Sequence, residues 1–371
     1  MHLFYLLFLL EVVLAIVAYT NVAEYVFMPV KKCTVTLLTD KRQLIYLLTA
    51  LGVMLFFHAF RDPLTLEDTP YYVRAIEEAR QMSVWDVISR GYEELKTETG
   101  FALFLKAIAD LFPFTQVLFI VTSCFMFFSF YVSIKRFSPI FWFSVLVLMT
   151  DSFPQSLFIL RGFLAFAILL FSIPFIIQRQ ILPYLLICMI AFTIHTTSII
   201  FFPVYFIYGI NNVKILSLAL ALGGLVLVVS FDVILPYILE RFLSEYLVYI
   251  VEADNYEGGN WKMPALLSAI LLFRLFVMKE HFFEEGINRL CSLVLILACV
   301  LYIAGLGFGL IGRMSLYFSN FTFLILPNTV QYLRSQTLQF SVALSYILLN
   351  GFFFLKSATG IFWIDYQLIS I

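Results

Sequence analysis

The sequence predicts an all-α polytopic membrane protein, a single integral-membrane domain over residues 1–371 with about twelve transmembrane helices. Hydrophobic residues make up 62% of the chain and charged residues only 13%, too few to cover a soluble domain of this length. Apolar runs of roughly 20 residues, enough for a helix to cross hydrocarbon, recur along the chain. They show no period-two alternation of the kind found in barrel strands, so helices are expected throughout.

Charge and cysteine usage exclude several classes of protein. The formal net charge of −1 provides no basic field, so no nucleic acid is expected as a partner. The five cysteines are scattered, mostly within apolar runs, and form no Cys-x-x-Cys motif. They are expected to be core thiols and not disulfides or metal ligands. No cofactor is expected, no metal-binding set is visible, and the use of a divalent metal is left open.

The first two apolar runs set the expected orientation. The run from Leu3 to Tyr19 lacks a basic leader and holds Glu11 at its centre, so it is expected to be an uncleaved first span. The connector that follows carries four basic residues, Lys31, Lys32, Lys41 and Arg42. By the positive-inside rule this connector is cytoplasmic and the N-terminus is outside. The second span, about 43–59, then leads outward and puts residues 61–100 on the external face.

Residues 61–100 form a long polar insertion with fourteen of the 47 charged residues. A helix is expected from Thr69, an N-cap followed by proline, and its apolar positions recur at helical spacing, so it should lie on the membrane surface. A second helix is expected from Ser83, where Asp86 completes a weak capping box and Trp85 belongs to the apolar face. The insertion is therefore expected to be a structured external loop with amphipathic helices.

The rest of the chain alternates between apolar runs and short polar connectors. The run 101–112 is too short to span and contains Lys106 and Asp110 one helical turn apart, which favours an interfacial or re-entrant helix. A second external loop is expected at 232–262. The remaining spans are expected at about 114–134, 139–150, 158–177, 181–195, 199–210, 214–231, 263–278, 290–308, 315–333 and 338–355.

This alternation gathers ionisable residues at the external ends of the predicted elements. They are Arg61, Asp62, Glu67, Asp68, Glu98, Asp151, Arg161, His195 and Arg313. Ionisable groups near hydrocarbon are costly and usually face a cavity or one another, so their common depth predicts one external polar chamber.

Three of these residues are candidates for binding or catalysis, each with a simpler alternative. Arg161 and Arg313 suit a diphosphate, which offers bidentate acceptors, but each guanidinium could instead reach the interface without binding anything. His195 begins a polar stretch in an apolar run. It could act in catalysis, but the simpler interpretation is a structural histidine that is hydrogen-bonded to nearby hydroxyl groups.

Five short motifs follow one another along the chain in the order found in a known family. The motifs are Phe60-Arg61 followed by Asp68 and Tyr71-Tyr72; Glu98-Thr99-Gly100-Phe101; Arg161 to Ala167; His195, Ser198 and Pro203; and Arg313 with Tyr317-Phe318. Together they resemble the EpsG family of bacterial exopolysaccharide membrane proteins, part of the wider group of Wzy-type repeat-unit polymerases. The chain departs from the family pattern at Gly162, where glutamine is expected, and at Thr196, often a proline.

The resemblance implies a membrane glycosyltransferase resembling the GT-C type, in the bacterial cytoplasmic (inner) membrane, with its active site facing the periplasm or cell exterior. It implies polymerisation of undecaprenyl-diphosphate-linked oligosaccharide repeat units into O-antigen, capsule or exopolysaccharide. The expected partners are those lipid-linked oligosaccharides, the lipid bilayer, and a chain-length regulator and a flippase of the same pathway.

Glycosyl transfer needs a base for the acceptor hydroxyl and positive charge for the leaving diphosphate. The leading hypothesis makes Asp68 the base, with Glu98 and His195 as competing or assisting candidates. The diphosphate would be held by Arg161 and Arg313, while Arg61 orients the loop or a phosphate. Sugar contacts are expected from four aromatic residues, Tyr71, Tyr72, Tyr256 and Trp261.

Two alternative functions stay open. One is a polyprenyl-linked transferase that adds a single sugar. The other is a transporter or flippase of lipid-linked sugars, a class that usually has charges at mid-membrane and two related halves. The sequence shows no such repeat, and its charges gather at the external ends of the spans, which favours the enzyme.

Overall fold

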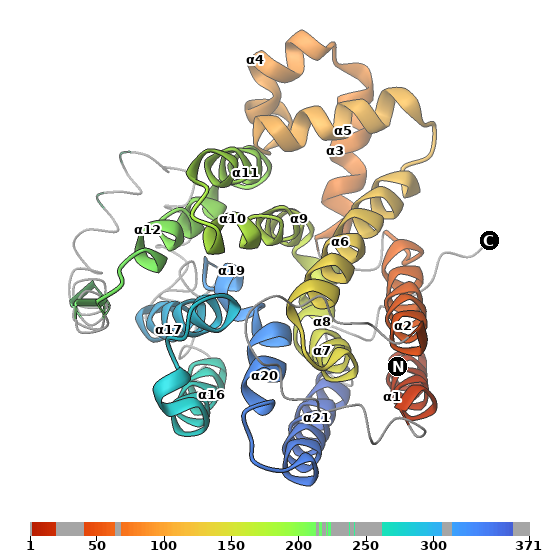
Figure 1. Cartoon of the computed structure of the whole chain (residues 1–371). Coiled ribbons are helices and arrows are strands. Elements are labelled where there is room, and N and C mark those ends of the chain that lie inside the picture. The colour runs from red at the N-terminus through yellow and green to blue at the C-terminus, as the bar shows by residue number, and fades with distance from the viewer. Residues whose placement is uncertain are drawn as a thin grey trace. The chain divides into compact units, whose positions relative to one another are not determined.

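The computed structural model describes residues 2–19, 41–63, 68–212, 262–305 and 314–358, with a few positions between 215 and 241. All elements in these ranges are helical, which confirms the all-α prediction for this part of the chain (Figure 1). The chain divides into two compact units. The first unit comprises residues 1–174, 182–199 and 322–371, and the second comprises 175–181 and 200–321.

Three of the described helices are long and apolar enough to cross a membrane. They are α2 (Lys41–Ala59), α6 (Gln116–Phe137) and α17 (Ile287–Ala304). Shorter apolar helices include α1 (His2–Tyr19), α9 (Leu160–Leu170) and α11 (Ile181–Ile194). These elements lie where spans were expected and are those of a membrane protein. The total of twelve spans and the likeness to the GT-C type stay predictions.

In the first unit, α6 packs along both α2 and α9. The helix α20 (Thr322–Val330) joins this bundle through two polar side chains. Ser144, in α7 (Phe141–Val147), donates to the carbonyl of Phe323 at 2.7 Å. The Asn328 amide donates to the carbonyl of Phe137 at 2.8 Å. Each bond satisfies a polar side chain inside an apolar bundle, so both fix the position of α20 at little desolvation cost.

The expected span 139–150 does not end at Asp151. Helical structure continues from α7 through a π-helical turn, Leu148–Ser152, into α8 (Phe153–Phe158). The widened turn holds Asp151 where its carboxylate accepts a 2.8 Å hydrogen bond from Tyr346 of α21 (Gln336–Ala358). The sequence pattern was misleading here because a carboxylate was taken as the end of a span, whereas a π-turn and a partner helix accommodate it inside one.

The loop expected at 61–100 and the short apolar run that follows it form three helices, which we call the cap, residues 69–111. They are α3 (Thr69–Gln81), α4 (Val84–Leu95) and α5 (Thr99–Leu111). The predicted capping box is present: Asp86 N–H donates to Ser83 Oγ, and Ser83 N–H donates to the Asp86 carboxylate. The predicted pair of Lys106 and Asp110 is also present, at 2.6 Å.

Two details of the cap differ from the prediction. Asp68, and not Thr69, is the N-cap residue of α3, so the helix starts one residue earlier than expected. Most of the apolar side of α3, including Ile76 and Ala79, is buried, and α3 packs on α5, so this side is not available to lie on a membrane. Burial against a neighbouring helix satisfied the same amphipathic pattern that suggested a surface helix.

Arg61 anchors the chain where it leaves α2. Its side chain is fully buried, with the guanidinium 4.6 Å from the centre of the Phe119 ring. It donates to the His58 carbonyl and to His58 Nδ1, whose ring also lies 2.6 Å from Ser123 Oγ. The Gln116 amide donates to the Ala59 carbonyl at 2.6 Å. The end of α2 and the start of α6 are therefore joined by buried polar contacts.

The second unit is held by another buried arginine. Arg274, in α16 (Lys262–Met278), donates to Ser292 Oγ at 2.9 Å and to the Asn288 carbonyl at 2.8 Å, both on α17. The other described elements of the second unit are short: α12 (Val204–Tyr208), a 3-10 turn at Lys279–His281, and α19 (Leu316–Ser319). The two helices α10 (Ile173–Ile177) and η2 (Thr196–Phe201) cross the unit boundaries.

We expect Arg61→Ala to destabilise the protein strongly, because removing one member of a buried polar cluster leaves its partners unsatisfied, at a cost on the order of 3 kcal/mol. The measurement is the thermal unfolding midpoint of the purified protein in one detergent. Arg90→Ala is the matched control, since Arg90 is 56% exposed and its ion pairs with Asp86 and Glu94 lie on the surface. Equal midpoints for the two variants would contradict the anchoring role of Arg61.

Candidate functional site

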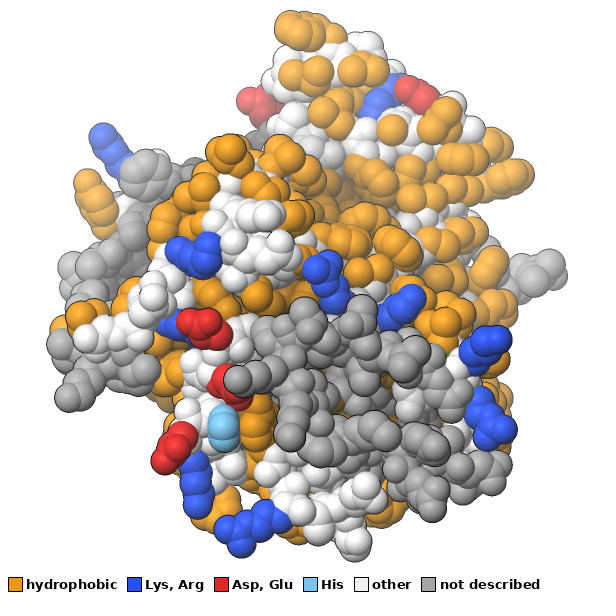
Figure 2. All heavy atoms as spheres, in the orientation of Figure 1, with side chains coloured by type: hydrophobic (Ala, Val, Ile, Leu, Met, Phe, Trp, Pro, Cys, Tyr) orange, Lys and Arg blue, Asp and Glu red, His pale blue; other side chains and the backbone are white. Residues whose placement is uncertain are grey.

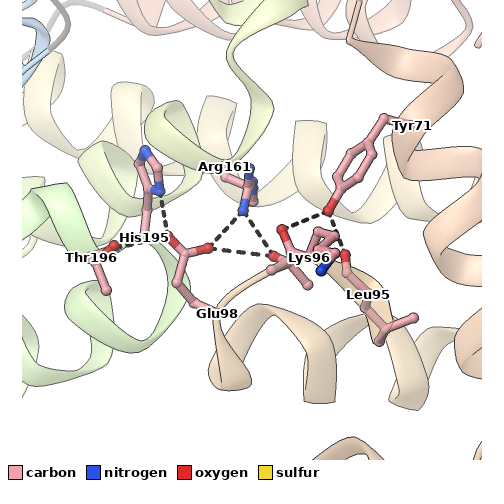
Figure 3. A network of polar contacts seen from close by, with 8 residues as sticks. Tyr71, Leu95, Lys96, Glu98, Arg161, His195 and Thr196 are labelled. Atoms are coloured by element: carbon pink, nitrogen blue, oxygen red, sulfur yellow. Dashed lines mark hydrogen bonds and ion pairs between the residues drawn. The ribbon is translucent and has the colours of Figure 1, made fainter. Parts of the chain in front are cut away.

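Three residues singled out from the sequence meet in the first unit: Glu98, Arg161 and His195 (Figure 3). Glu98 is the N-cap residue of α5, Arg161 lies in the first turn of α9, and His195 directly follows α11. The Glu98 carboxylate lies between the two basic side chains, 2.8 Å from the Arg161 guanidinium and 2.7 Å from His195 Nδ1. Helices far apart in the sequence therefore share one ionic cluster.

Both oxygens of Glu98 are engaged in hydrogen bonds. Oε1 accepts from His195 Nδ1, from the Thr196 N–H at 3.0 Å and from Thr196 Oγ1 at 3.1 Å. Oε2 accepts from Arg161 and lies 3.4 Å from Thr97 Oγ1. The side chain is only 7% exposed. A carboxylate with this many donors is held in one orientation and is poorly placed to take up a proton.

These contacts also determine the charge of Glu98. Burial favours the neutral carboxyl and would raise its pKa, but it is outweighed by the hydrogen bond and charge of His195, the charge of Arg161 and the Thr196 N–H. The pKa of Glu98 is therefore held well below its usual range. At neutral pH Glu98 is a carboxylate, so it serves as an acceptor that orients its neighbours.

His195 is oriented by this carboxylate. Because Glu98 can only accept hydrogen bonds, the 2.7 Å contact assigns the proton of a neutral His195 ring to Nδ1. Nε2 then carries the lone pair. The imidazole is 18% exposed, so the ring is partly open to solvent. A carboxylate that fixes one imidazole tautomer is the usual device for making the other ring nitrogen a proton acceptor.

Arg161 is bordered by the two tyrosines that begin α3. Its guanidinium lies 5.8 Å from the centre of the Tyr71 ring, and its charge opposes the rise that burial causes in the pKa of Tyr72. Burial raises the pKa of Tyr71 to about 12, so its phenol stays protonated and donates to the backbone carbonyls of Leu95 and Lys96. The Arg161 side chain is 24% exposed, which leaves part of the guanidinium accessible.

These contacts change the view of the two tyrosines as sugar contacts. Tyr72 is 4% exposed and packs edge-on against Phe101, so it has almost no surface to offer a sugar. The Tyr71 hydroxyl caps the C-terminal end of α4, while its ring stays partly exposed beside the guanidinium.

Two glycines lie at the cluster, and the first of them allows two of its helices to come close together. A Cβ at Gly100 would lie 2.4 Å from Thr193 Oγ1 and 2.6 Å from the Thr193 carbonyl, so the start of α5 touches the end of α11. A Cβ at Gly162 would lie 3.7 Å from His195 Cδ2, the ring carbon beside Nε2. The absence of a side chain at Gly162 therefore keeps the approach to Nε2 open.

The other predicted site residues lie elsewhere or outside the described residues. Asp68 is exposed at the start of α3, and its charge reaches Tyr72. Arg61 is fully buried near the end of α2, so it does not present its guanidinium beside Arg161. The remaining three, Arg313, Tyr256 and Trp261, fall outside the residues that the structure describes, as does the expected external loop at 232–262 apart from positions 237, 241 and 262.

The sequence reasoning missed two members of the cluster. Thr196 gives Glu98 two hydrogen bonds, and Thr97 Oγ1 accepts one from Arg161 at 3.0 Å. The signal for both was present: each threonine adjoins a candidate residue at the end of an apolar helix, where a hydroxyl usually serves a neighbour. Within the described ranges, no group of three or more His, Cys, Asp or Glu side chains is arranged to hold a metal ion.

We expect Gly100→Ala to disrupt the cluster and lower stability, because the added Cβ meets Thr193 backbone and the helices must separate. Gly91→Ala is the matched control, since a Cβ there meets only ordinary contacts at 3.5 Å with Ala102 and Val87. In an interior helical position alanine is favoured over glycine by about 1 kcal/mol, so the control should be neutral or stabilising. The measurement is the thermal unfolding midpoint of each variant in one detergent. A midpoint of Gly100→Ala equal to that of wild type would contradict the close approach of α5 and α11.

The charge of Glu98 makes a second prediction, on acid stability. Its pKa is lower in the folded chain than the value of about 4.3 expected when unfolded, so its contribution is complete at neutral pH and is lost as the pH falls through the folded-state pKa. The stability advantage of wild type over Glu98→Gln should therefore shrink below about pH 4. Thermal midpoints across a pH series test this, with exposed Glu94→Gln reporting general acid sensitivity. An advantage that is constant with pH would contradict it.

Comparison with known proteins identifies a family for this chain. Neither the curated proteins nor the solved structures contain a match to this chain. Residues 44–368 match the EpsG family, and the matched segment covers nearly the whole chain, including Glu98, Arg161 and His195. The members of that family resemble Wzy-type polymerases and are membrane proteins of polysaccharide biosynthesis. The chain belongs to the EpsG family.

Proposed function

We propose that this protein is a membrane glycosyltransferase that polymerises undecaprenyl-diphosphate-linked oligosaccharide repeat units, with His195 as the general base. The observation that carries the proposal is the cluster in which Glu98 fixes His195 through Nδ1 while Arg161 lies on the other carboxylate oxygen. A proton acceptor and a cation held side by side are what glycosyl transfer from a diphosphate requires.

In the proposed reaction, the acceptor hydroxyl oxygen attacks the anomeric carbon of the donor sugar. The bond between that carbon and the diphosphate oxygen breaks, and undecaprenyl diphosphate leaves with the electron pair. The proton of the hydroxyl passes to His195 Nε2, the ring nitrogen that Glu98 leaves open. Glu98 is a positioning residue in this scheme, since its own oxygens are occupied by donors.

Charge in the cluster changes in the direction that the reaction needs. With a neutral imidazole, the Arg161 guanidinium and the Glu98 carboxylate balance each other. When His195 accepts the proton, the three groups together become positively charged, at the moment when the departing diphosphate gains negative charge. Interactions that strengthen only as the reaction proceeds lower the barrier, whereas those equal in both states do not.

Asp68 is the alternative base. It is exposed at the start of α3, and it lies close enough to Tyr72 to affect the pKa of the phenol, which in turn contacts Arg161. His195 is preferred because a carboxylate orients its ring. Arg61 would hold the loop and not a phosphate, since it is fully buried. Diphosphate binding by Arg313 and sugar binding by Tyr256 and Trp261 stay part of the proposal.

Orientation and substrate delivery complete the proposal. The site would face the periplasm or cell exterior, since the basic connector before α2 is expected on the cytoplasmic side. The lipid-linked oligosaccharides would arrive from a flippase, and a chain-length regulator would act on the same product. The expected chemistry uses no cofactor.

The test is polymerisation by purified protein supplied with undecaprenyl-diphosphate-linked repeat units from its own pathway, with products separated by length. Wild type should give a ladder. His195→Asn should lower the rate about 100-fold or more, the loss typical when a general base is removed. Glu98→Gln should also lower the rate, and Asp68→Asn should keep the ladder. The matched control is Glu94→Gln, a carboxylate that is 43% exposed on the outer side of α4.

Other results assign the protein differently. A ladder kept in His195→Asn and lost in Asp68→Asn would move the base to Asp68. A single added sugar, with no ladder from wild type, would favour the single-sugar transferase. Movement of the lipid-linked substrate from one leaflet of a vesicle membrane to the other, without transfer of sugar, would identify a flippase and overturn the proposal.

A further inference from the structure

The cap carries an exposed apolar surface that the proposed reaction does not use. It comprises six residues that we call the apolar tip: Val84, Trp85, Ile88, Leu111, Phe112 and Phe114. Trp85 is 74% exposed, Leu111 72% and Phe114 71%. Figure 2 shows hydrophobic side chains on the surface in the region of α4 and α5, beside a few acidic and basic ones. Large apolar side chains gathered in this way usually mark a contact surface.

The six residues come together because α4 and α5 form an antiparallel pair. A Cβ at Gly91 of α4 would lie 3.5 Å from Ala102 of α5, and counting outward from this contact brings the start of α4 beside the end of α5. Val87 and Leu95 of α4 are buried, so α4 has one apolar side toward the cap and another, with Trp85, outward. The packing of the cap therefore does not account for the tip.

The backbone ends at the tip are satisfied by protein groups. Arg80 donates to the carbonyls of Ala109 at 2.7 Å, Phe112 at 3.1 Å and Pro113 at 3.3 Å, at the end of α5. At the start of α4, the capping box satisfies the N–H groups of Ser83 and Asp86. Helix ends normally rely on water for several of these groups. Backbone groups that are hydrogen-bonded within the protein do not need water, so such a surface can be transferred into an apolar environment at a low free-energy cost.

The tip also lies at the level where two candidate spans end. Ala59, the last residue of α2, accepts a hydrogen bond from Gln116, the first residue of α6. Phe114 comes two residues before Gln116, and Thr115 between them donates to Glu77 of α3 at 2.9 Å. The tip is therefore joined directly to the start of α6, a helix long and apolar enough to cross a membrane. Tryptophan is enriched at the boundary between hydrocarbon and water in membrane proteins.

We infer that the apolar tip inserts into the lipid bilayer at the boundary between headgroups and acyl chains. The cap would then be attached to the membrane at one end. Glu98 lies at the other end of α5, about 20 Å away along a helix of this length. Membrane attachment would hold the cap, and with it the N-terminal end of α5, at a fixed depth. The inference does not depend on the proposed reaction.

The test measures the fluorescence of Trp85 in phosphatidylcholine nanodiscs, either plain or brominated on the acyl chains near the headgroup. The contribution of Trp85 is obtained as the difference between wild type and Trp85→Phe, a conservative change at an exposed position that should not affect folding. We expect the Trp85 emission to be blue-shifted in plain nanodiscs and mostly lost in brominated ones. The same subtraction with Trp142→Phe is the control, since Trp142 is 7% exposed and should be quenched less.

Two other results would overturn the inference. Trp85 emission that brominated lipid leaves unchanged but aqueous acrylamide quenches would mean that the tip faces water. Emission that neither quencher reaches would mean that protein covers the tip, either a second copy or another partner. None of these measurements involves sugar transfer, so a failure of this inference and a failure of the proposed function are distinguishable.

Discussion

The carboxylate of Glu98 is the constraint on which the candidate site depends. It is nearly buried and accepts hydrogen bonds from residues that adjoin α9 and α11, while it belongs to the start of α5. A charged group at such a position is costly unless every oxygen is satisfied, and here the Arg161 guanidinium and several N–H and O–H donors satisfy both. The same bonds that compensate for burial also orient the imidazole and the guanidinium.

Buried arginines serve a similar purpose elsewhere in the chain. Arg61 donates to His58 at the end of α2 and places its guanidinium over the Phe119 ring of α6. Arg274 joins α16 to α17 through bonds to a hydroxyl and a carbonyl oxygen. In an apolar bundle, where van der Waals packing is nearly the same between helices and lipid, such bonds give specificity to helix pairing. Arg161 differs from these two because it pairs with a carboxylate and stays partly exposed, which suits a substrate-binding role.

Sequence patterns predicted elements better than they predicted contacts. The helical class, the positions of α2 and α6 and the capping box of α4 follow from local rules of length, charge and capping, and all are present. The meeting of Glu98, Arg161 and His195 followed from topology alone. The burial of Arg61 and Tyr72 could not be predicted, because the sequence shows that a residue is polar or aromatic but not which neighbour covers it. The π-turn at Asp151 likewise depends on Tyr346, almost 200 residues further along.

The two departures from the family pattern acquire a physical meaning in the cluster. A proline at position 196 would have neither a backbone N–H nor a hydroxyl, so Glu98 Oε1 would lose both bonds that Thr196 provides. Threonine therefore makes the carboxylate more fully engaged in this chain and confines it to orienting His195. A glutamine at position 162 would start from a Cβ that is 2.9 Å from Ile159 Cγ2 and 3.7 Å from the imidazole, on the side next to Nε2. Glycine places no side chain there, so both departures favour the division of roles proposed above, in which Glu98 orients His195 and His195 accepts the proton.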